Sequence, residues 1–363
     1  MERIADSRGF EPDIAVPPGE ALKESIDALG MSQAELALRM NRPQKTINEI
    51  IKGKAAITPQ TAVELERVLR APAPFWLRLE MDYQTALARQ KEREEIAEDL
   101  RLLNHFPYLE MAKLGWVEHV AGKAEQVAEL RSFFGVVTLS RIRLVEEAAY
   151  RKSQKKQASA EALSAWLRKG ELDAQSVETS AFDRDGFFSA LAEIRGLTRG
   201  PIAEASVLLR KLCAACGVAV AFVPHITGTY ANGATRWLTA TKALVQLSIR
   251  HRYEDIFWFT FFHECGHILK HGKRACFIDM QGDTPSDEEA EADAFARDVL
   301  IPPDRYRSFR TLARFSGENV VQFAADVGVS PAIIVGRLQH DTLLPPTHLN
   351  HLRRQLKWIH EVA

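Results

Sequence analysis

The sequence predicts a mainly α-helical protein with a small β-sheet, an α+β fold. Most of the 363 residues lie in helical segments separated by turn signals. Short β-branched and aromatic runs gather in residues 218–249. The segment "RYEDIFWFTFFHECGHILKHG", residues 252–272, is too long and apolar for a surface helix, so we expect it in the middle of a domain.

The composition is that of an ordinary globular protein, with 46% hydrophobic and 26% charged residues. The net charge of −1 excludes a global field that recruits nucleic acid, so any such binding needs a local basic patch. Four cysteines are too few for a disulfide framework in a chain of this size. The first residues lack the apolar core of a signal peptide, and no apolar run approaches the roughly 18–20 residues that span a bilayer. We therefore expect a cytoplasmic protein with no membrane partner.

Three regions follow one another along the chain. Residues 1–90 hold short helical segments, and residues 91–195 are helical and highly charged, as expected of a helical linker region. Residues 196–363 contain a helix, then strands, then further helices. In this last region residues 242–249 are predicted to form a strand, and Asn232-Gly233 is predicted to form a hairpin turn.

The first region contains a helix–turn–helix pattern in "MSQAELALRMNRPQKTINEIIKGKAAITPQTAVELERVL", residues 31–69. Ser32 is placed to cap a short helix, and a tight turn at 41–43 brings a proline to the start of the next helix, Gln44 to Ile51. Thr58-Pro59 is placed to cap another helix. Two short helices joined by a tight turn form the helix-turn-helix unit.

The second helix of this unit exposes polar side chains of the types that read base edges in the major groove. Residues 39–54 carry five basic residues against Glu49 alone, which makes a local basic face on a neutral chain. The candidate contacts to a double-stranded DNA operator are Gln44, Lys45, Thr46, Asn48 and Lys52. The alternative is a small helical bundle that contacts protein.

A second motif, H-E-x-x-H, occurs in "FFHECGHILKHG", residues 261–272. On a helix His263 and His267 stand one turn apart, where two imidazoles can bind one zinc ion. Glu264 would then act as general base toward a water activated by the metal. The alternative is a core helix whose histidines form hydrogen bonds inside the protein. A metal explains three polar groups on a core helix more simply, because buried polar groups without partners are unfavourable.

A hydrolytic zinc site needs a third protein ligand and an open fourth position. The segment "PSDEEAEADAFARDVLIPP", residues 285–303, supplies the candidates. Ser286 and Glu289 form a capping box, which assigns Glu289 to the start of a helix. On that helix Glu288 falls within the apolar stripe and Glu291 at its edge, so periodicity leaves these two as candidate ligands.

The segments "FFHECGHILKHG" and "EADAFARDVLIP" together resemble the ImmA/IrrE family of zinc metallopeptidases, over roughly residues 196–345. That family pairs an H-E-x-x-H helix with a downstream E-A-N-x-F-A-x-x-L-L-x-P helix, in which Asp293 here replaces the Asn. The resemblance implies a zincin-like domain that binds Zn²⁺ through His263, His267 and Glu291, with Glu264 as catalytic base. We interpret Asp293 as not touching the ligands.

Residues 12–90 resemble the Xre/Cro-type domain, and more closely the HigA-like antidotes. "PPGEALKESIDALGMSQAELA" precedes the unit, and "PAPFWLRLEMDYQ", residues 72–84, follows it as a fifth helix. The resemblance implies a homodimer on a pseudo-palindromic operator. A weaker helix-turn-helix pattern at residues 320–344 is expected to support the zinc domain by packing.

The sequence therefore predicts a DNA-binding transcriptional regulator, antitoxin- or repressor-like, fused to a zinc-dependent metallo-endopeptidase. Relatives of this domain imply a role in stress or toxin–antitoxin control, with a protein substrate or a cognate regulator or toxin as partner. We expect residues 242–249 to form an open edge strand that holds an extended substrate. The alternatives are a zinc domain that is a non-hydrolytic sensor or partner-binding module, and a peptidase whose first domain only docks a protein.

Overall fold

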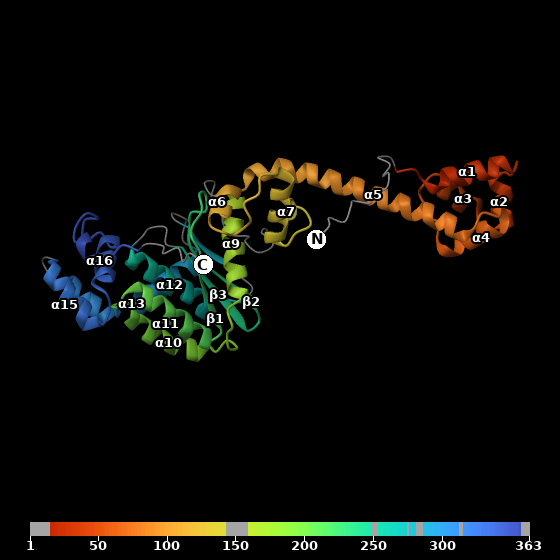
Figure 1. The fold of residues 1–363 in the computed structure, drawn as a ribbon. Coiled ribbons are helices and arrows are strands. Elements are labelled where there is room, and N and C mark those ends of the chain that lie inside the picture. Colours follow the sequence, from red (N-terminus) through yellow and green to blue (C-terminus); the bar gives the residue numbers. More distant parts are fainter. Residues whose placement is uncertain are drawn as a thin grey trace, which may run out of the picture. The chain divides into compact units, whose positions relative to one another are not determined.

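The computed structural model describes residues 15–142, 159–248, 253–273, 276–280, 286–311 and 315–356. The chain forms two compact units, Met1–Glu98 and Asp99–Ala363. Helices dominate both in Figure 1, and one small sheet lies in the second unit. The predicted fold class, mainly α with a small β-sheet, is confirmed.

The described part of the first unit holds five helices, as predicted. They are α1 (Pro18–Ala28), α2 (Gln33–Arg39), α3 (Gln44–Ile51), α4 (Pro59–Leu69) and α5 (Ala73–Leu102). The Ser32 side chain accepts a hydrogen bond from the Glu35 N–H at the start of α2. Thr58 caps α4 in the same way. The core of this unit includes Leu22, Leu36, Ile47, Leu65 and Trp76.

Helix α5 extends well beyond the fifth helix that the sequence predicts for residues 72–84. It runs for 30 residues without a break, so the predicted domain boundary at residue 90 falls inside a helix. The two compact units meet near its end, at Glu98 and Asp99. A boundary inside a continuous helix carries no turn signal, which is why composition placed it too early.

The sheet of the second unit has four strands among the described residues, in the order β1-β3-β2-β4. They are β1 (Val218–Phe222), β2 (Ala231–Thr239), β3 (Lys242–Leu247) and β4 (Phe277–Met280). β1 pairs with β3 in parallel, and β2 pairs antiparallel with both β3 and β4. The prediction that residues 242–249 form an open edge was wrong. β3 is an interior strand, and its continuous buried run from Ala243 to Leu247 is typical of strands covered on both faces.

The predicted hairpin turn at Asn232-Gly233 was also wrong, because both residues lie inside β2. The turn between β2 and β3 falls at residues 240–241 instead. Gly233 has another use in the structure. A Cβ atom there would lie 2.5 Å from Oε1 of Glu264 and 2.6 Å from Cγ2 of Thr260. Glycine therefore allows the strand to approach α12 (Glu254–Lys270) closely.

One face of the sheet is covered by helices from the region predicted to be a linker. These are α6 (Tyr108–Lys113), α7 (Lys123–Phe134) and α9 (Ala160–Gln175), with a 3₁₀ turn at Leu103–His105. Trp166 of α9 donates its indole N–H to the Val223 carbonyl at 3.1 Å, and Gln246 donates to the Trp166 carbonyl at 2.6 Å. Residues 99–195 therefore belong to the second unit. Their apolar side chains are needed to bury Ala219, Ala221 and Leu244.

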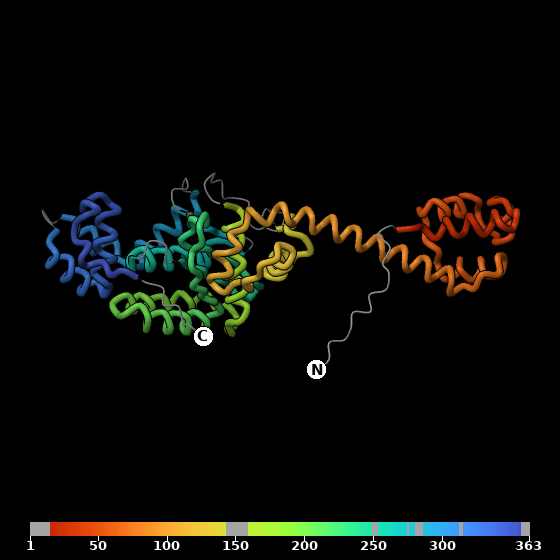
Figure 2. Tube along the Cα trace, turned by 45° about the horizontal axis from the view of Figure 1, so that its top comes forward, coloured from red at the N-terminus to blue at the C-terminus, as the bar shows by residue number. Residues whose placement is uncertain are grey.

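The other face is covered by α10 (Arg184–Leu197), α11 (Ile202–Ala215), α12 (Glu254–Lys270) and α13 (Asp287–Leu300). The chain then forms α14 (Pro303–Arg310), α15 (Gly317–Val327) and α16 (Pro331–His340), with a second 3₁₀ turn at Asn350–Leu352. Figure 2 shows α15 and α16 in blue at one end of this unit. α16 is largely buried, through Ile333, Ile334, Val335 and Leu338, so this pair packs against the unit.

Among the described residues no single helix is long and apolar enough to cross a membrane. Only the bent pair α15 and α16, with 113° between its members, passes such a test, by length and composition alone.

Candidate metal centre and DNA-binding helix

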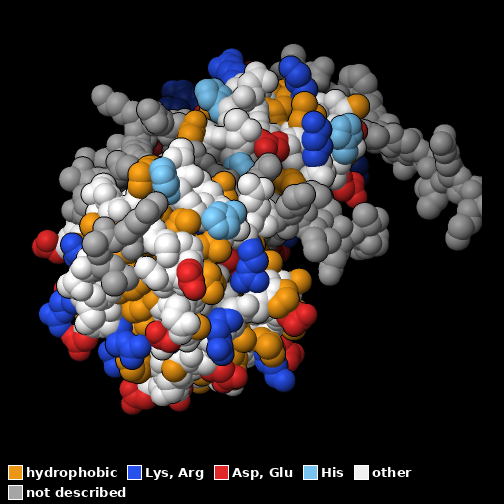
Figure 3. Space-filling view, turned by 90° about the vertical axis from the view of Figure 1, so that its left-hand side faces the viewer, with side chains coloured by type: hydrophobic (Ala, Val, Ile, Leu, Met, Phe, Trp, Pro, Cys, Tyr) orange, Lys and Arg blue, Asp and Glu red, His pale blue; other side chains and the backbone are white. Residues whose placement is uncertain are grey.

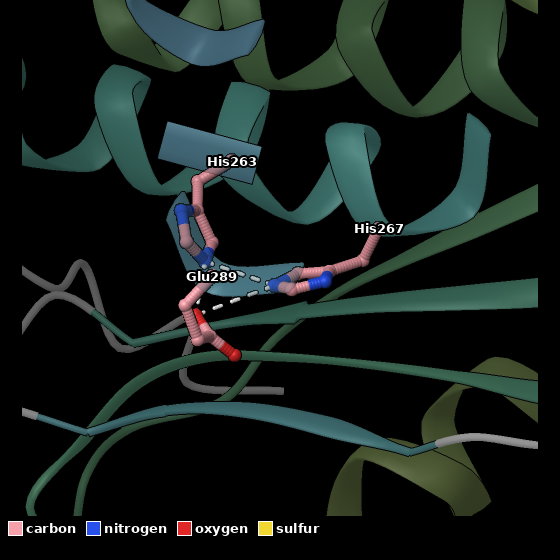
Figure 4. Close-up of side chains that lie close together, drawn as sticks. All are labelled: His263, His267 and Glu289. Atoms are coloured by element: carbon pink, nitrogen blue, oxygen red, sulfur yellow. Dashed lines mark hydrogen bonds and ion pairs between the residues drawn. The ribbon is translucent and has the colours of Figure 1, made fainter. Parts of the chain in front are cut away.

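Helices α12 and α13 bring two histidines and a glutamate together (Figure 4). His263 and His267 come from α12 and are 4% and 2% exposed, and Glu289 comes from the first turn of α13. Oε2 of Glu289 lies 3.0 Å from Nε2 of His263 and 3.5 Å from Nε2 of His267. The two Nε2 atoms are 3.0 Å apart. One donor atom from each of the three residues lies within 4.8 Å of the others, so they could hold one metal ion.

The structure does not bring Glu291, the expected third ligand, to this group. Its Oε2 atom lies 3.4 Å from Nε2 of His271, and its side chain is 62% exposed. Two positions along an α-helix correspond to about 200° of rotation, so Glu289 and Glu291 point in nearly opposite directions. Glu288, the other candidate, is half-buried and is not part of the group either.

The capping box is the reason that the sequence interpretation set Glu289 aside. Ser286 does cap α13, but its hydroxyl accepts from the backbone N–H of Glu289, at 3.3 Å. The Glu289 carboxylate takes no part in that bond and is free to turn toward the histidines. The backbone N–H of Glu289 thus takes part in the helix cap, while its carboxylate contacts the histidines.

Asp293 contacts His263, contrary to the interpretation that it does not touch the ligands. Its Oδ1 atom lies 2.9 Å from Nδ1 of His263. Asp293 follows Glu289 by four residues and so shares its helix face, a spacing that could have revealed the pair. A carboxylate on Nδ1 fixes the ring and leaves Nε2 to face a metal.

His267 is held from two further sides. Its Nδ1 atom lies 2.9 Å from Nδ1 of His271, the C-cap of α12. Phe277 of β4 stacks on the His267 ring with the centroids 4.1 Å apart and 14° between the planes. The two imidazoles are therefore oriented by neighbours before any metal is considered.

Glu264 is completely buried beside this group. Thr235 donates its hydroxyl to Oε2 of Glu264 at 2.5 Å, whereas Oε1 has no hydrogen-bond partner among the described residues. Burial raises the pKa of Glu264 to about 8, although the nearby His263 acts in the opposite direction. A buried carboxylate oxygen without a partner is unfavourable for stability. Such an atom fits a site that receives a water or a substrate.

The carboxylates of the group favour positive charge on His263. Burial lowers the pKa of His263, but its hydrogen bonds to Asp293 and Glu289 outweigh burial and raise it to about 11. Burial raises the pKa of Glu289, but the hydrogen bonds from the two histidines outweigh it and lower the pKa to about 2. Two imidazoles and one carboxylate form a donor set that hydrolytic zinc sites use. The residues present therefore fit a zinc ion.

In the first unit, α3 carries the candidate DNA contacts. Gln44, Lys45 and Lys52 are exposed, and Thr46 and Asn48 are half-buried, while Ile47 and Ile50 point into the core. Two other basic residues of the local patch are engaged within the protein. Nε of Arg42 lies 2.5 Å from Oε2 of Glu64, and Arg39 pairs with Glu35 at 2.5 Å. The patch that faces solvent is therefore smaller than the sequence count indicates.

The fold and the two sites define a helix-turn-helix protein whose second unit has a helix with an H-E-x-x-H motif beside a candidate metal centre. Comparison with known families agrees: the helix-turn-helix family matches residues 22–76, and the family described as the IrrE N-terminal-like domain matches residues 250–339. The chain belongs to the helix-turn-helix family through its first unit, and part of its second unit matches the IrrE-like family model. Both predicted resemblances are confirmed.

Individual relatives match a short part of the chain. The HTH-type transcriptional regulator YddM of Escherichia coli is 34% identical over 73 residues, 20% of this chain and 78% of that protein. Virulence-associated protein A of Dichelobacter nodosus is 38% identical over 74 residues, 20% of this chain and 71% of that protein. A solved structure of an addiction module antidote protein of the HigA family from Coxiella burnetii is 30% identical. It covers 23% of this chain and 94% of that one, with a TM-score of 0.22.

Proposed function

We propose that the protein is a DNA-binding transcriptional regulator, antitoxin- or repressor-like, whose second unit is a zinc-dependent metallo-endopeptidase. Its substrate would be a regulatory protein, such as a cognate repressor or toxin, in stress or toxin–antitoxin control. One observation carries the hydrolytic part. The three donors on α12 and α13 lie beside Glu264, a buried carboxylate whose Oε1 atom has no hydrogen-bond partner among the described residues.

Each residue has a role in this proposal. His263, His267 and Glu289 would hold Zn²⁺, and Asp293 would orient His263 through Nδ1. Zinc, when bound, polarises a peptide carbonyl and lowers the pKa of a water molecule. Oε1 of Glu264 accepts the proton of the attacking water and returns it to the nitrogen of the leaving amine. The Thr235 hydroxyl keeps the carboxylate in place through Oε2.

The substrate would lie along β4 instead of β3. β4 is an edge strand among the described residues, and its Phe277 stacks on His267, so this edge runs directly beside the donors. The backbone groups of an edge strand can pair with an extended peptide. A peptide added to β4 would bring its carbonyl groups close to the metal centre.

The first unit would bind a double-stranded DNA operator through α3. Gln44, Lys45, Thr46 and Asn48 would meet the major groove, and Lys52, just after the helix, would contact phosphate. Such units usually act as dimers on two half-sites, so we infer a homodimer. We infer a cytoplasmic protein, because its proposed partner is DNA.

A non-hydrolytic zinc sensor is the second candidate. The fusion of a DNA-binding unit and the metal site in one chain favours it, because DNA binding can then be regulated allosterically by metal binding. Glu264 opposes it, because a sensor gains nothing from a buried carboxylate oxygen that has no hydrogen-bond partner among the described residues.

The variant Glu264→Gln separates the two candidates. It is nearly isosteric and leaves all three donors in place, so zinc content should stay at the wild-type value. Loss of the general base should lower the rate of peptide cleavage by about 10²–10⁴-fold. The measurement is mass spectrometry of new termini in a library of proteome-derived peptides, incubated with zinc-loaded full-length protein. Equal cleavage by both proteins, or none by wild type with full zinc, would leave the sensor as the better description.

A further inference from the structure

A cavity separate from the three donors lies between α12, α13 and α16. Its volume is about 170 Å³. The apolar part of its wall is formed by Ile256, Phe259, Leu300, Ile301 and Ile333. Figure 3 shows the end of the second unit where α15 and α16 lie, with apolar side chains in orange interspersed with basic ones in blue, histidines in pale blue and acidic ones in red.

The size of the cavity limits its occupant. An apolar cavity of about 150 Å³ in another protein stays dry and binds benzene. The cavity here is slightly larger, so it can take one six-membered ring or a branched aliphatic chain of similar volume. Its walls have few polar atoms to hold water, which makes an apolar occupant favourable.

The charged groups at the cavity differ in whether they are neutralised. Both oxygens of Asp255 accept hydrogen bonds from Arg353, at 3.0 and 2.8 Å. Arg337 and His340 both pair with Asp341, at 2.9 and 3.1 Å.

Arg297 of α13 is different. It also lines the cavity, and its guanidinium forms no hydrogen bond or ion pair with any residue that the structure describes. Among the residues that the structure describes, the charge that remains unpaired at this cavity is therefore positive. A planar guanidinium matches a carboxylate with two parallel hydrogen bonds.

We propose that this cavity binds a small apolar carboxylate, with its ring or branched chain among the isoleucines and its carboxylate on Arg297. Nothing in this step needs a metal or the hydrolytic reaction, so it goes beyond the proposed function.

The position of the cavity gives its ligand a means of acting on the metal centre. Phe259 precedes His263 by one helical turn, and their ring centroids are 6.3 Å apart. Arg297 follows Asp293 by one turn on α13. A ligand here contacts both helices that supply the donors and also α16, so it stabilises their packing.

The test is calorimetric titration of the full-length protein after its metal has been removed with EDTA, because carboxylates also bind zinc. The probes are benzoate and 4-methylpentanoate, and benzamide is the uncharged partner of benzoate. We expect saturable binding of one acid per chain, and binding of benzamide weaker by at least about tenfold.

Three variants locate the binding. Arg297→Gln should weaken both acids by about tenfold or more. Arg305→Gln is the matched control, because Arg305 is exposed on α14 and does not line the cavity. The affinity of this variant for both acids should equal that of wild type. Ile333→Phe should abolish binding by filling the cavity.

Several results would overturn the proposal. They are an absence of saturable binding up to about 10 mM acid, equal affinity for benzoate and benzamide, and equal affinity in wild type and folded Arg297→Gln. The benzamide comparison uses wild type alone, so the proposal stays testable if a variant fails to fold. None of these results bears on zinc binding or peptide cleavage.

Discussion

Three carboxylates on α13 have three different surroundings although the first and the last are only four positions apart. Glu289 lies between two buried imidazoles, Asp293 lies on the far nitrogen of one of them, and Glu291 is mostly exposed beside His271. Chemical type is the same in all three. The helical rotation between neighbouring positions decides which of them can reach a metal.

Zinc content should therefore respond to Glu289→Ala and hardly at all to Glu291→Ala. The first variant removes a donor, so its zinc affinity should fall by more than the roughly 10–100-fold that loss of an outer partner produces. The measurement is zinc per chain by mass spectrometry after dialysis against a chelator of known affinity. If Glu291→Ala lost its zinc and Glu289→Ala kept it, the ligand set that the family resemblance implied would be correct.

The Arg42–Glu64 pair gives a second prediction at this scale. The hydrogen bond from Arg42 is the largest cause of the lowered pKa of Glu64, whose ordinary value is 4.5. A lowered pKa in the folded state contributes stability above about pH 4.5, and this contribution is lost as the pH falls through the lower, folded value. For such a pair near the surface the contribution is about 0.5–1 kcal/mol.

Glu64→Gln should thus speed amide hydrogen exchange in α3 at pH 7 and have a smaller effect at an acid pH below the lowered pKa of Glu64, where wild type has lost the same contribution. Exchange is measured on the full chain by mass spectrometry, with α1 as internal reference. An equal effect at both pH values would show that the charge on Glu64 does not stabilise the turn that contains Arg42.

At the scale of elements, α3 combines exposed polar residues with a buried apolar face. Replacing Gln44 or Asn48 by Ala should lower the preference for the selected sequence by about 1–3 kcal/mol, since base contacts carry specificity. Lys52→Ala should instead weaken binding to all sequences and reduce the salt slope by about 1.

The measurement is fluorescence anisotropy over a range of salt, with duplexes selected from a random library by the wild-type protein. Arg39→Ala is a suitable comparison, because Arg39 precedes α3 and pairs with Glu35. If all three α3 variants lost specific and non-specific binding equally, α3 would not be the element in the groove.

Elements defined by local signals could be predicted from the sequence, and those defined by long-range pairing could not. Ser32 and Thr58 cap their helices because capping involves residues three positions apart. β3 is an interior strand because β1, which precedes β2 in the sequence, pairs with the edge of β3 that β2 leaves open. This pairing joins strands that are not consecutive in the sequence, so no local signal predicts it. His263 and His267 lie four positions apart on one helix, so their proximity could be predicted from the sequence. The carboxylate that joins them, Glu289, depends on how α13 is rotated about its axis relative to α12.

The second unit as a whole includes a helical layer that the sequence did not assign to it. α9 covers the sheet face formed by Ala219, Ala221 and Leu244. Its Trp166 donates a hydrogen bond to the Val223 carbonyl just after β1. A fragment of residues 99–363 should therefore fold and hold about one zinc per chain.

A fragment of residues 196–363 should not, because that sheet face would be open to water. Circular dichroism and zinc analysis of the two purified fragments check this expectation. A folded, zinc-loaded fragment of residues 196–363 would restore the linker interpretation of residues 91–195.

Gly233 matters for how such proteins are recognised in genomes. The space that Oε1 of Glu264 occupies exists because the facing strand has no side chain there. A single methyl group at position 233 would displace the carboxylate while leaving every letter of H-E-x-x-H unchanged. A chain could thus drift from enzyme to sensor through a residue some thirty positions upstream of its motif. Surveys that count intact motifs would then include proteins that cannot hydrolyse a peptide. The residue at the position of Gly233 would distinguish these proteins from the active enzymes.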